Sequence, residues 1–283
     1  MTKTWRYYVQ RFFFWILIAI ILVYLVFPFY WALRSSITPN SEMFATPVHY
    51  WPNHPTWTFY SQVFHNHNFM RSMLNSAIVA GSVTVLSLMV GAFASFALGR
   101  FSFRGRAPVM YITLSMTMFP QIAVLGSLYE LISKFHLYNT LYALIITYLL
   151  FTLPFTVWVL TTFFQAMPRE LEEAAYVDGA TPFQVFYKVL LPLAAPGLVT
   201  TGLLAFIAAW NEFLYALSFI QTPNHFTITL AIFNFTTNTT GGFELPWGQM
   251  MAGTVIVTLP LIALTLIFQR RILAGLTAGA VKG

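Results

Sequence analysis

The sequence lacks cysteine and has few charged residues. Of its 283 residues, 8% are charged, whereas a soluble domain usually carries about 25%. The absence of cysteine excludes disulfides and thiol chemistry, and it leaves the redox compartment open. So few charges would cover little of a water-facing surface, while 58% hydrophobic and 18% aromatic residues suit contact with lipid. The composition predicts a polytopic membrane protein.

The signatures of several catalytic sites are also missing. The sequence has no Gly-x-x-x-x-Gly-Lys-Ser/Thr segment, the loop that cradles nucleotide phosphates, and no glycine is followed by lysine. It has no His-x-x-Glu-His zinc site, and we recognise no Ser–His–Asp set in it. We therefore expect this chain to be no enzyme, to have no catalytic residues, and to bind no metal or cofactor.

Six apolar segments are long enough to cross a bilayer, which takes roughly 20 residues of helix. They predict an all-α membrane protein with six transmembrane helices, in which residues 1–283 form a single transmembrane domain. The expected spans are residues 12–33, 73–99, 107–131, 138–164, 193–220 and 248–268.

Basic residues predict the orientation of these spans. Of the 14 Lys and Arg residues, 11 fall in the terminal segments and alternate connections that share one side, and only Arg34, Arg71 and Lys134 fall on the other side. Because basic residues accumulate in cytoplasmic segments, both termini are expected in the cytoplasm. The net charge of +6 then reflects topology, and we expect no nucleic-acid partner.

The connection between the fourth and fifth spans, residues 165–192, predicts two short helices. Pro168 suits the first position of a helix and Gly179 suits the position just after one. Thr181 and Pro182 are typical of the cap and first residue of a second helix, and Pro192 indicates its end. We expect these helices to lie against the cytoplasmic surface.

This connection is also the one cytoplasmic segment that carries acids. It holds two basic residues against four acidic ones, which are Glu170, Glu172, Glu173 and Asp178. An anionic lipid surface would not attract it, whereas a basic groove on a protein would. Helix capping explains the acids of the first turn, but not Asp178 at the opposite end.

The spacing of this segment closely resembles the EAA loop of bacterial ABC-importer permeases. Its matching positions are Glu173-Ala174-Ala175, Gly179, Val189 and Leu191-Pro192, with Val189 where isoleucine is usual. Asn75-Ser76, Arg100–Gly105, Met118–Gln121, Trp210–Leu214 and the last ten residues look like the MalG-type carbohydrate permeases. The resemblance extends over nearly the whole chain.

The resemblance implies a fold, a site and a set of partners. It implies the type I ABC-importer permease fold in a bacterial inner membrane, with the EAA loop docked on a cytoplasmic ATPase. It implies a heterodimer with a MalF-like second permease, two copies of the ATPase that bind ATP and magnesium, and an extracytoplasmic sugar-binding protein. The solute would be a sugar, such as a maltose- or trehalose-type oligosaccharide. The expected coupling residues are Glu172, Glu173, Ala174, Ala175, Asp178, Gly179, Leu191 and Pro192.

Two further groups of residues are candidates for contact with the solute or its carrier. Glu212 is the one acid well inside an expected span, where burying a charge is costly; a structural clamp between helices and a place in the sugar path both remain open for it. Gln121, beside Pro120, is a second path candidate. The path candidates are Gln121, Trp210, Asn211, Glu212 and Tyr215. The candidate tip for contact with the binding protein is Thr239, Thr240, Gly241 and Gly242, with a disordered loop as the alternative.

The main alternatives to an importer permease are other classes of membrane protein. A secondary transporter or channel would need embedded coupling carboxylates or a charged filter, and one embedded acid is thin support. A membrane enzyme would need the catalytic sets that the sequence lacks.

Overall fold

The computed structural model describes residues 5–236 and 245–278, and every regular element in those ranges is a helix. Four helices are long and apolar enough to cross a membrane, and the number rises to six if each of two bent helix pairs forms one span. The all-α expectation is confirmed. The chain divides into two compact units, one made of residues 1–66 and 232–258 and the other of residues 67–231 and 259–283.

The first unit begins with the long helix α1 (Trp5–Ser36), whose apolar side chains are largely exposed. An ordered loop follows, with the short helices α2 (Asn40–Met43) and α3 (Thr58–His65). Arg34 holds this loop because its guanidinium donates to the His49 carbonyl at 2.7 Å and lies 5.0 Å from the Trp31 ring.

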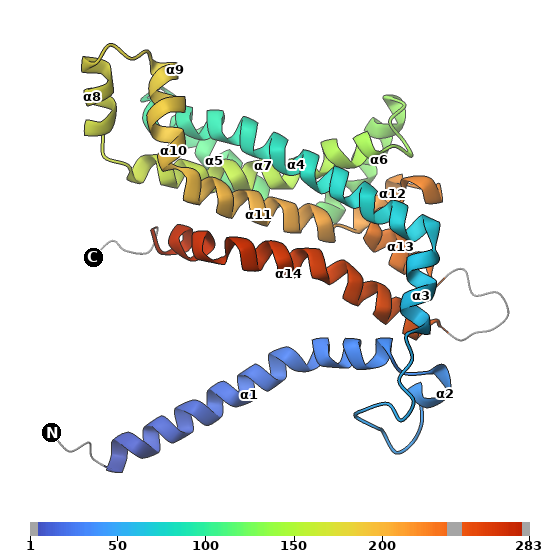
Figure 1. Ribbon diagram of the computed structural model, residues 1–283. Coiled ribbons are helices and arrows are strands. Elements are labelled where there is room, and N and C mark those ends of the chain that lie inside the picture. Colours follow the sequence, from blue (N-terminus) through green and yellow to red (C-terminus); the bar gives the residue numbers. More distant parts are fainter. Residues whose placement is uncertain (1–4, 237–244, 279–283) are drawn as a thin grey trace. The chain divides into compact units, whose positions relative to one another are not determined.

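The second unit is built on three helices that pack side by side (Figure 1): α4 (His67–Arg100), α7 (Leu141–Ala166) and α11 (Ala195–Asn211). Small residues allow the close approach of α4 and α7, since a Cβ added at Gly91 or Gly99 would lie 2.8 Å from a side-chain atom of α7. Hydroxyl groups also join these two helices, as Ser87 and Thr152 lie 2.8 Å apart.

The third expected span, residues 107–131, is not one helix. Helix α5 (Arg106–Thr117) ends, Pro120 adopts an extended conformation, and η1 (Gln121–Val124) and α6 (Leu125–Lys134) then continue at 97° to α5. Proline has no N–H to donate to the preceding turn, so it breaks the helical ladder here. The two halves together still form one candidate span, bent at Pro120.

The fifth expected span, residues 193–220, is also interrupted. Helix α11 ends at Asn211, Glu212 is extended, and α12 (Leu214–Phe219) follows. Asn211 and Glu212 are the polar residues at the break, but the flanking sequence is apolar on both sides, so hydropathy alone did not reveal it. After α12, the described elements are η3 (Pro223–His225), α13 (Ile228–Asn234) and α14 (Trp247–Ala278).

Candidate functional site

The expected pair of short helices is present beyond the end of α7 (Figure 1). The first, α8 (Glu170–Val177), starts two residues after Pro168, so the prediction of Pro168 as the first helical residue was slightly wrong. Gly179 follows the cap residue Asp178 just after the helix, as expected, and its φ of +81° is a left-handed conformation that glycine adopts without steric cost. The chain therefore turns sharply between the two helices.

The second helix starts with the expected cap at Thr181. Its hydroxyl accepts the N–H of Gln184, and the Gln184 side chain accepts the N–H of Thr181 at 2.8 Å. The helix runs through α9 (Pro182–Gln184), the π-helical turn η2 (Val185–Leu190) and α10 (Leu191–Leu193). Pro192 does not end it, contrary to the prediction. The break comes after Leu193, where α11 departs at 74°.

Aromatic packing anchors this second helix to the three-helix core. Phe186 is buried, and its ring lies 4.9 Å from the rings of both Phe93 and Phe96 on α4. Phe164 at the end of α7 completes this buried cluster. The segment 180–193, called the elbow base below, is therefore fixed to the bundle by apolar contacts, whereas α8 projects from it.

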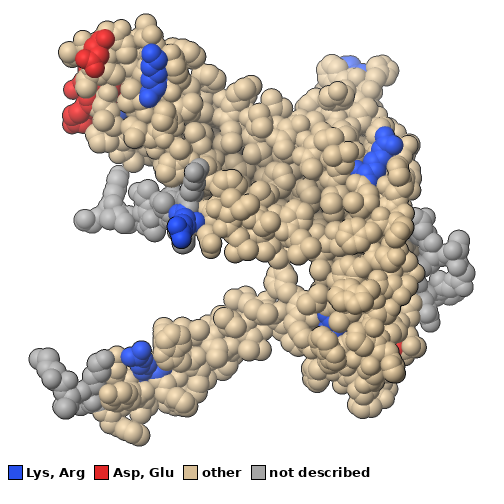
Figure 2. Space-filling view, in the orientation of Figure 1, with Lys and Arg blue, Asp and Glu red and all other residues tan. Residues whose placement is uncertain are grey.

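Four of the eight predicted coupling residues are exposed on α8 or directly after its last residue. Glu173, Ala174, Asp178 and Gly179 are exposed, whereas Ala175 is half-buried against the aromatic cluster. In the elbow base, Leu191 is half-buried and Pro192 is exposed. Figure 2 shows acidic side chains gathered at this end of the molecule, over α8. The result is a small acidic surface on a rigid support.

Glu172 differs from the other acids of α8. Its carboxylate forms an ion pair with the guanidinium of Arg100, the last residue of α4, and both side chains are largely buried. Its charge is therefore used inside this chain. Sequence reasoning missed this contact because 72 residues separate the partners and no local pattern connects them.

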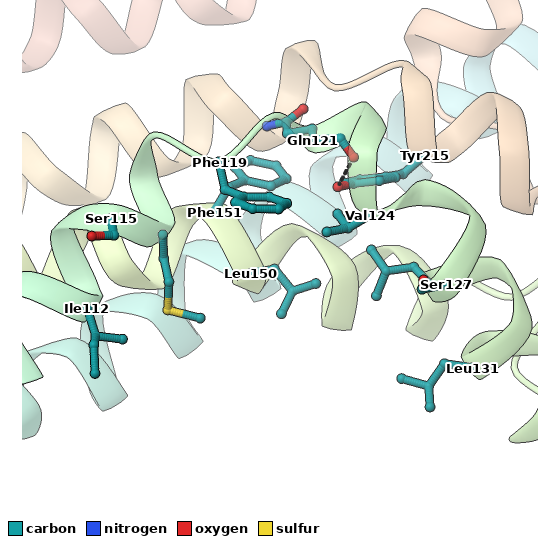
Figure 3. A pocket seen from close by; sticks show the side chains of 12 residues that line it. Ile112, Ser115, Phe119, Gln121, Val124, Ser127, Leu131, Leu150, Phe151 and Tyr215 are labelled. Atoms are coloured by element: carbon teal, nitrogen blue, oxygen red, sulfur yellow. Dashed lines mark hydrogen bonds between the residues drawn. The ribbon is translucent and has the colours of Figure 1, made fainter.

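A cavity of about 640 Å³ lies beside the break in the third span (Figure 3). Phe119, Gln121 and Ser127 line it from the broken segment, Phe151 lines it from α7, and Tyr215 lines it from α12. The Tyr215 hydroxyl donates to the backbone carbonyl of Gln121 at 3.2 Å and joins the two interrupted spans. Aromatic faces next to an amide and a hydroxyl form the lining, together with aliphatic side chains.

The structure separates the other predicted path residues from this cavity. Trp210 is buried, and its indole N–H has no hydrogen-bond partner within the described part of the chain. The Asn211 amide donates to the Ile207 carbonyl on its own helix at 3.0 Å. Of the five candidates, the structure therefore brings only Gln121 and Tyr215 together in the cavity lining.

Glu212 caps the start of α12. Its carboxylate accepts the N–H groups of Tyr215 at 2.7 Å and Ala216 at 3.2 Å, which no helical carbonyl can satisfy. Its own carbonyl accepts the Thr229 hydroxyl at 2.7 Å. These contacts describe a structural clamp, one of the two roles that the sequence left open. The predicted binding-protein tip, Thr239 to Gly242, lies outside the described residues.

The fold and the projecting acidic helix define an integral membrane permease subunit that carries an EAA-type loop. Residues 87–277 match the family described as the binding-protein-dependent transport system inner membrane component. The chain belongs to this family and is the permease subunit of an ABC importer. The importer prediction is confirmed, and the alternative of a secondary transporter or channel finds no support.

Curated relatives match over nearly their whole lengths. The chain is 40% identical to the trehalose transport system permease protein SugB of Mycobacterium tuberculosis, over 95% of this chain and 96% of that protein. It is 38% identical to the trehalose/maltose transport system permease protein MalG of Thermococcus litoralis, over 95% and 94% of the two chains. A chain of a bacterial ABC transporter involved in the import of the acidic polysaccharide alginate has the same fold, with a TM-score of 0.82, 20% identity and coverage of 95% and 99%.

Proposed function

We propose that this subunit conducts an uncharged sugar across the membrane and that α8 docks in a basic cleft of a separate ATPase subunit. The observation that carries the proposal is the exposed acidic surface of α8, at a bundle end, in a chain without a phosphate-binding loop. Energy from ATP has to reach such a chain through a contact with another protein. Glu173 and Asp178 supply the charge, and Ala174 allows close approach.

The proposed assembly follows the architecture that the family resemblance implies. Two ATPase copies, which bind ATP and magnesium, serve two permeases, this chain and a MalF-like partner. A binding protein delivers the sugar on the outer side, where the segment from Thr239 to Gly242 meets it. Both termini lie in the cytoplasm of a bacterial cell, as the distribution of basic residues favours.

A disaccharide is the solute class that the relatives and the cavity favour together. SugB and MalG are named for trehalose and maltose transport. In this chain the cavity offers the rings of Phe119 and Phe151 for stacking and the amide of Gln121 for hydrogen bonds to hydroxyl groups. No Asp, Glu, Lys or Arg lines it, which suits an uncharged solute. We propose that the sugar path passes Gln121 and Tyr215, while Glu212 holds Tyr215 in place.

The docking of α8 is tested by reversing the charge of Glu173. Glu173→Lys, in the reconstituted importer with its ATPase and binding protein, is expected to abolish sugar-stimulated ATP hydrolysis and uptake, because a cation would then face the basic cleft. Glu130→Lys is the matched control, since Glu130 is exposed on α6, away from the elbow. Membrane insertion of both variants is checked by fractionation. Normal coupled uptake by the Glu173→Lys assembly contradicts the docking assignment.

A further inference from the structure

Arg100 joins three helices at the end of the bundle that carries α8. It is the last residue of α4, and its side chain reaches the carboxylate of Glu172 on α8. The same guanidinium donates to the carbonyl oxygens of Phe164 at 2.9 Å and Met167 at 3.0 Å, at the end of α7. A further bond reaches the Pro168 carbonyl at 3.2 Å. One side chain thus connects α4, α7 and the coupling helix.

The contacts of Arg100 differ from those of an ordinary surface ion pair. Exposed pairs contribute little because water and salt screen them. The Arg100 side chain is only 4% exposed and that of Glu172 only 14% exposed. These carbonyls belong to the last turn of α7 and the residues just after it, where the Phe164 carbonyl also accepts the Met167 N–H at 3.3 Å. The planar guanidinium has enough donors to bond these carbonyls and the carboxylate together. Lysine has a single ammonium group and does not reproduce this geometry.

We propose that Arg100 is the positioning residue that fixes the coupling helix to the membrane helices, so that a displacement of α8 moves α4 and α7 with it. This inference rests on the proposed docking of α8. The apolar contacts of the elbow base hold the segment after Gly179, whereas α8 itself stands before that turn. The Arg100–Glu172 pair therefore supplies a charged connection on the α8 side of the turn. It also assigns Glu172 to force transmission and leaves Glu173 and Asp178 to meet the ATPase.

The test measures the number of sugar molecules imported per ATP hydrolysed by the reconstituted importer. Arg100→Gln is expected to lower this ratio by about tenfold while ATP hydrolysis continues, because α8 would then move without the bundle. Glu172→Gln is expected to lower it by a smaller factor, since the bonds to the α7 carbonyls remain. Arg100→Lys is expected to restore the ratio only partly. Arg104→Gln is the matched control, because Arg104 is exposed in the same connection.

A cross-linking measurement separates this inference from the docking proposal. Val177→Cys, introduced with and without Arg100→Gln, reports whether α8 reaches the ATPase, because Val177 is exposed on α8 and carries no docking charge. If the cross-link to the ATPase forms in both backgrounds and Arg100→Gln keeps the normal import ratio, the role of Arg100 is refuted and docking stands. If no cross-link forms even with Arg100 present, docking itself is refuted. If the Arg100→Gln variant does not assemble, the Glu172→Gln variant is measured instead. An unchanged ratio of imported sugar to hydrolysed ATP in Glu172→Gln overturns the proposed role of Arg100.

Discussion

At the scale of single residues, neighbouring acids have different roles. Glu172 pairs with Arg100 inside the chain, Glu173 is exposed one residue later, and Glu212 caps a helix within the bundle. The residue type alone does not distinguish these three side chains, since all are glutamates in apolar or amphipathic stretches of sequence. Burial and hydrogen-bond partners make the distinction.

The sugar path has its sharpest test at Gln121. Gln121→Ala removes the amide from the cavity lining, and the loss of one hydrogen bond, worth about 0.5–1.5 kcal/mol, is expected to slow sugar uptake by roughly 2–10-fold. The initial uptake rate of reconstituted vesicles, measured against the concentration of sugar-loaded binding protein, checks this. Gln165→Ala is the control, because Gln165 is exposed at the end of α7 and does not line the cavity. If the unsubstituted, Gln121→Ala and Gln165→Ala assemblies all take up sugar at the same initial rate, Gln121 does not contribute to the sugar path.

At the scale of elements, the turn between α8 and the elbow base depends on the backbone of Gly179. A Cβ added there meets no atom within 4 Å, so a substitution acts only through the positive φ. Left-handed backbone costs other residues about 1–2 kcal/mol, and asparagine tolerates it better than most.

Gly179→Ala is therefore expected to lower sugar-stimulated ATP hydrolysis more than Gly179→Asn does. A stimulated-ATPase assay on the purified assembly measures the difference. Gly126→Ala is the matched control, because Gly126 also has open space around its Cβ position but lies in the helix α6 without a positive φ. If the alanine and asparagine variants behave alike, the turn geometry is not what limits coupling.

The sequence predicted the elbow better than it predicted the spans. The cap at Thr181 and the turn at Gly179 depend on neighbouring residues alone, so the sequence predicted both of them correctly. The breaks at Pro120 and Glu212 lie within apolar runs, where hydropathy reports length but not continuity. The connection from Arg100 to Glu172 joins distant parts of the sequence, so only the folded chain reveals it.

At the scale of the whole molecule, the chain is a transport subunit, and we propose that its energy comes from a separate ATPase. Its long apolar helices and the polar groups of its cavity suit passage through a membrane, while its sequence lacks the loop that would bind ATP phosphates. Rigid-body motion of the packed helices is the expected response when a docked ATPase changes its conformation. The central claim is therefore that α8 sits in a separate ATPase.

Site-specific cross-linking at α8 tests this claim most directly, and the natural absence of cysteine gives this chain a clean background. Val177→Cys places a single thiol on the exposed surface of α8 without removing a docking charge, and Glu130→Cys places one on α6 as the control. In the assembled importer, α8 is predicted to cross-link to the ATPase subunit and α6 is not. Absence of the α8 product, in an assembly that still imports sugar at the expense of ATP, would contradict the account.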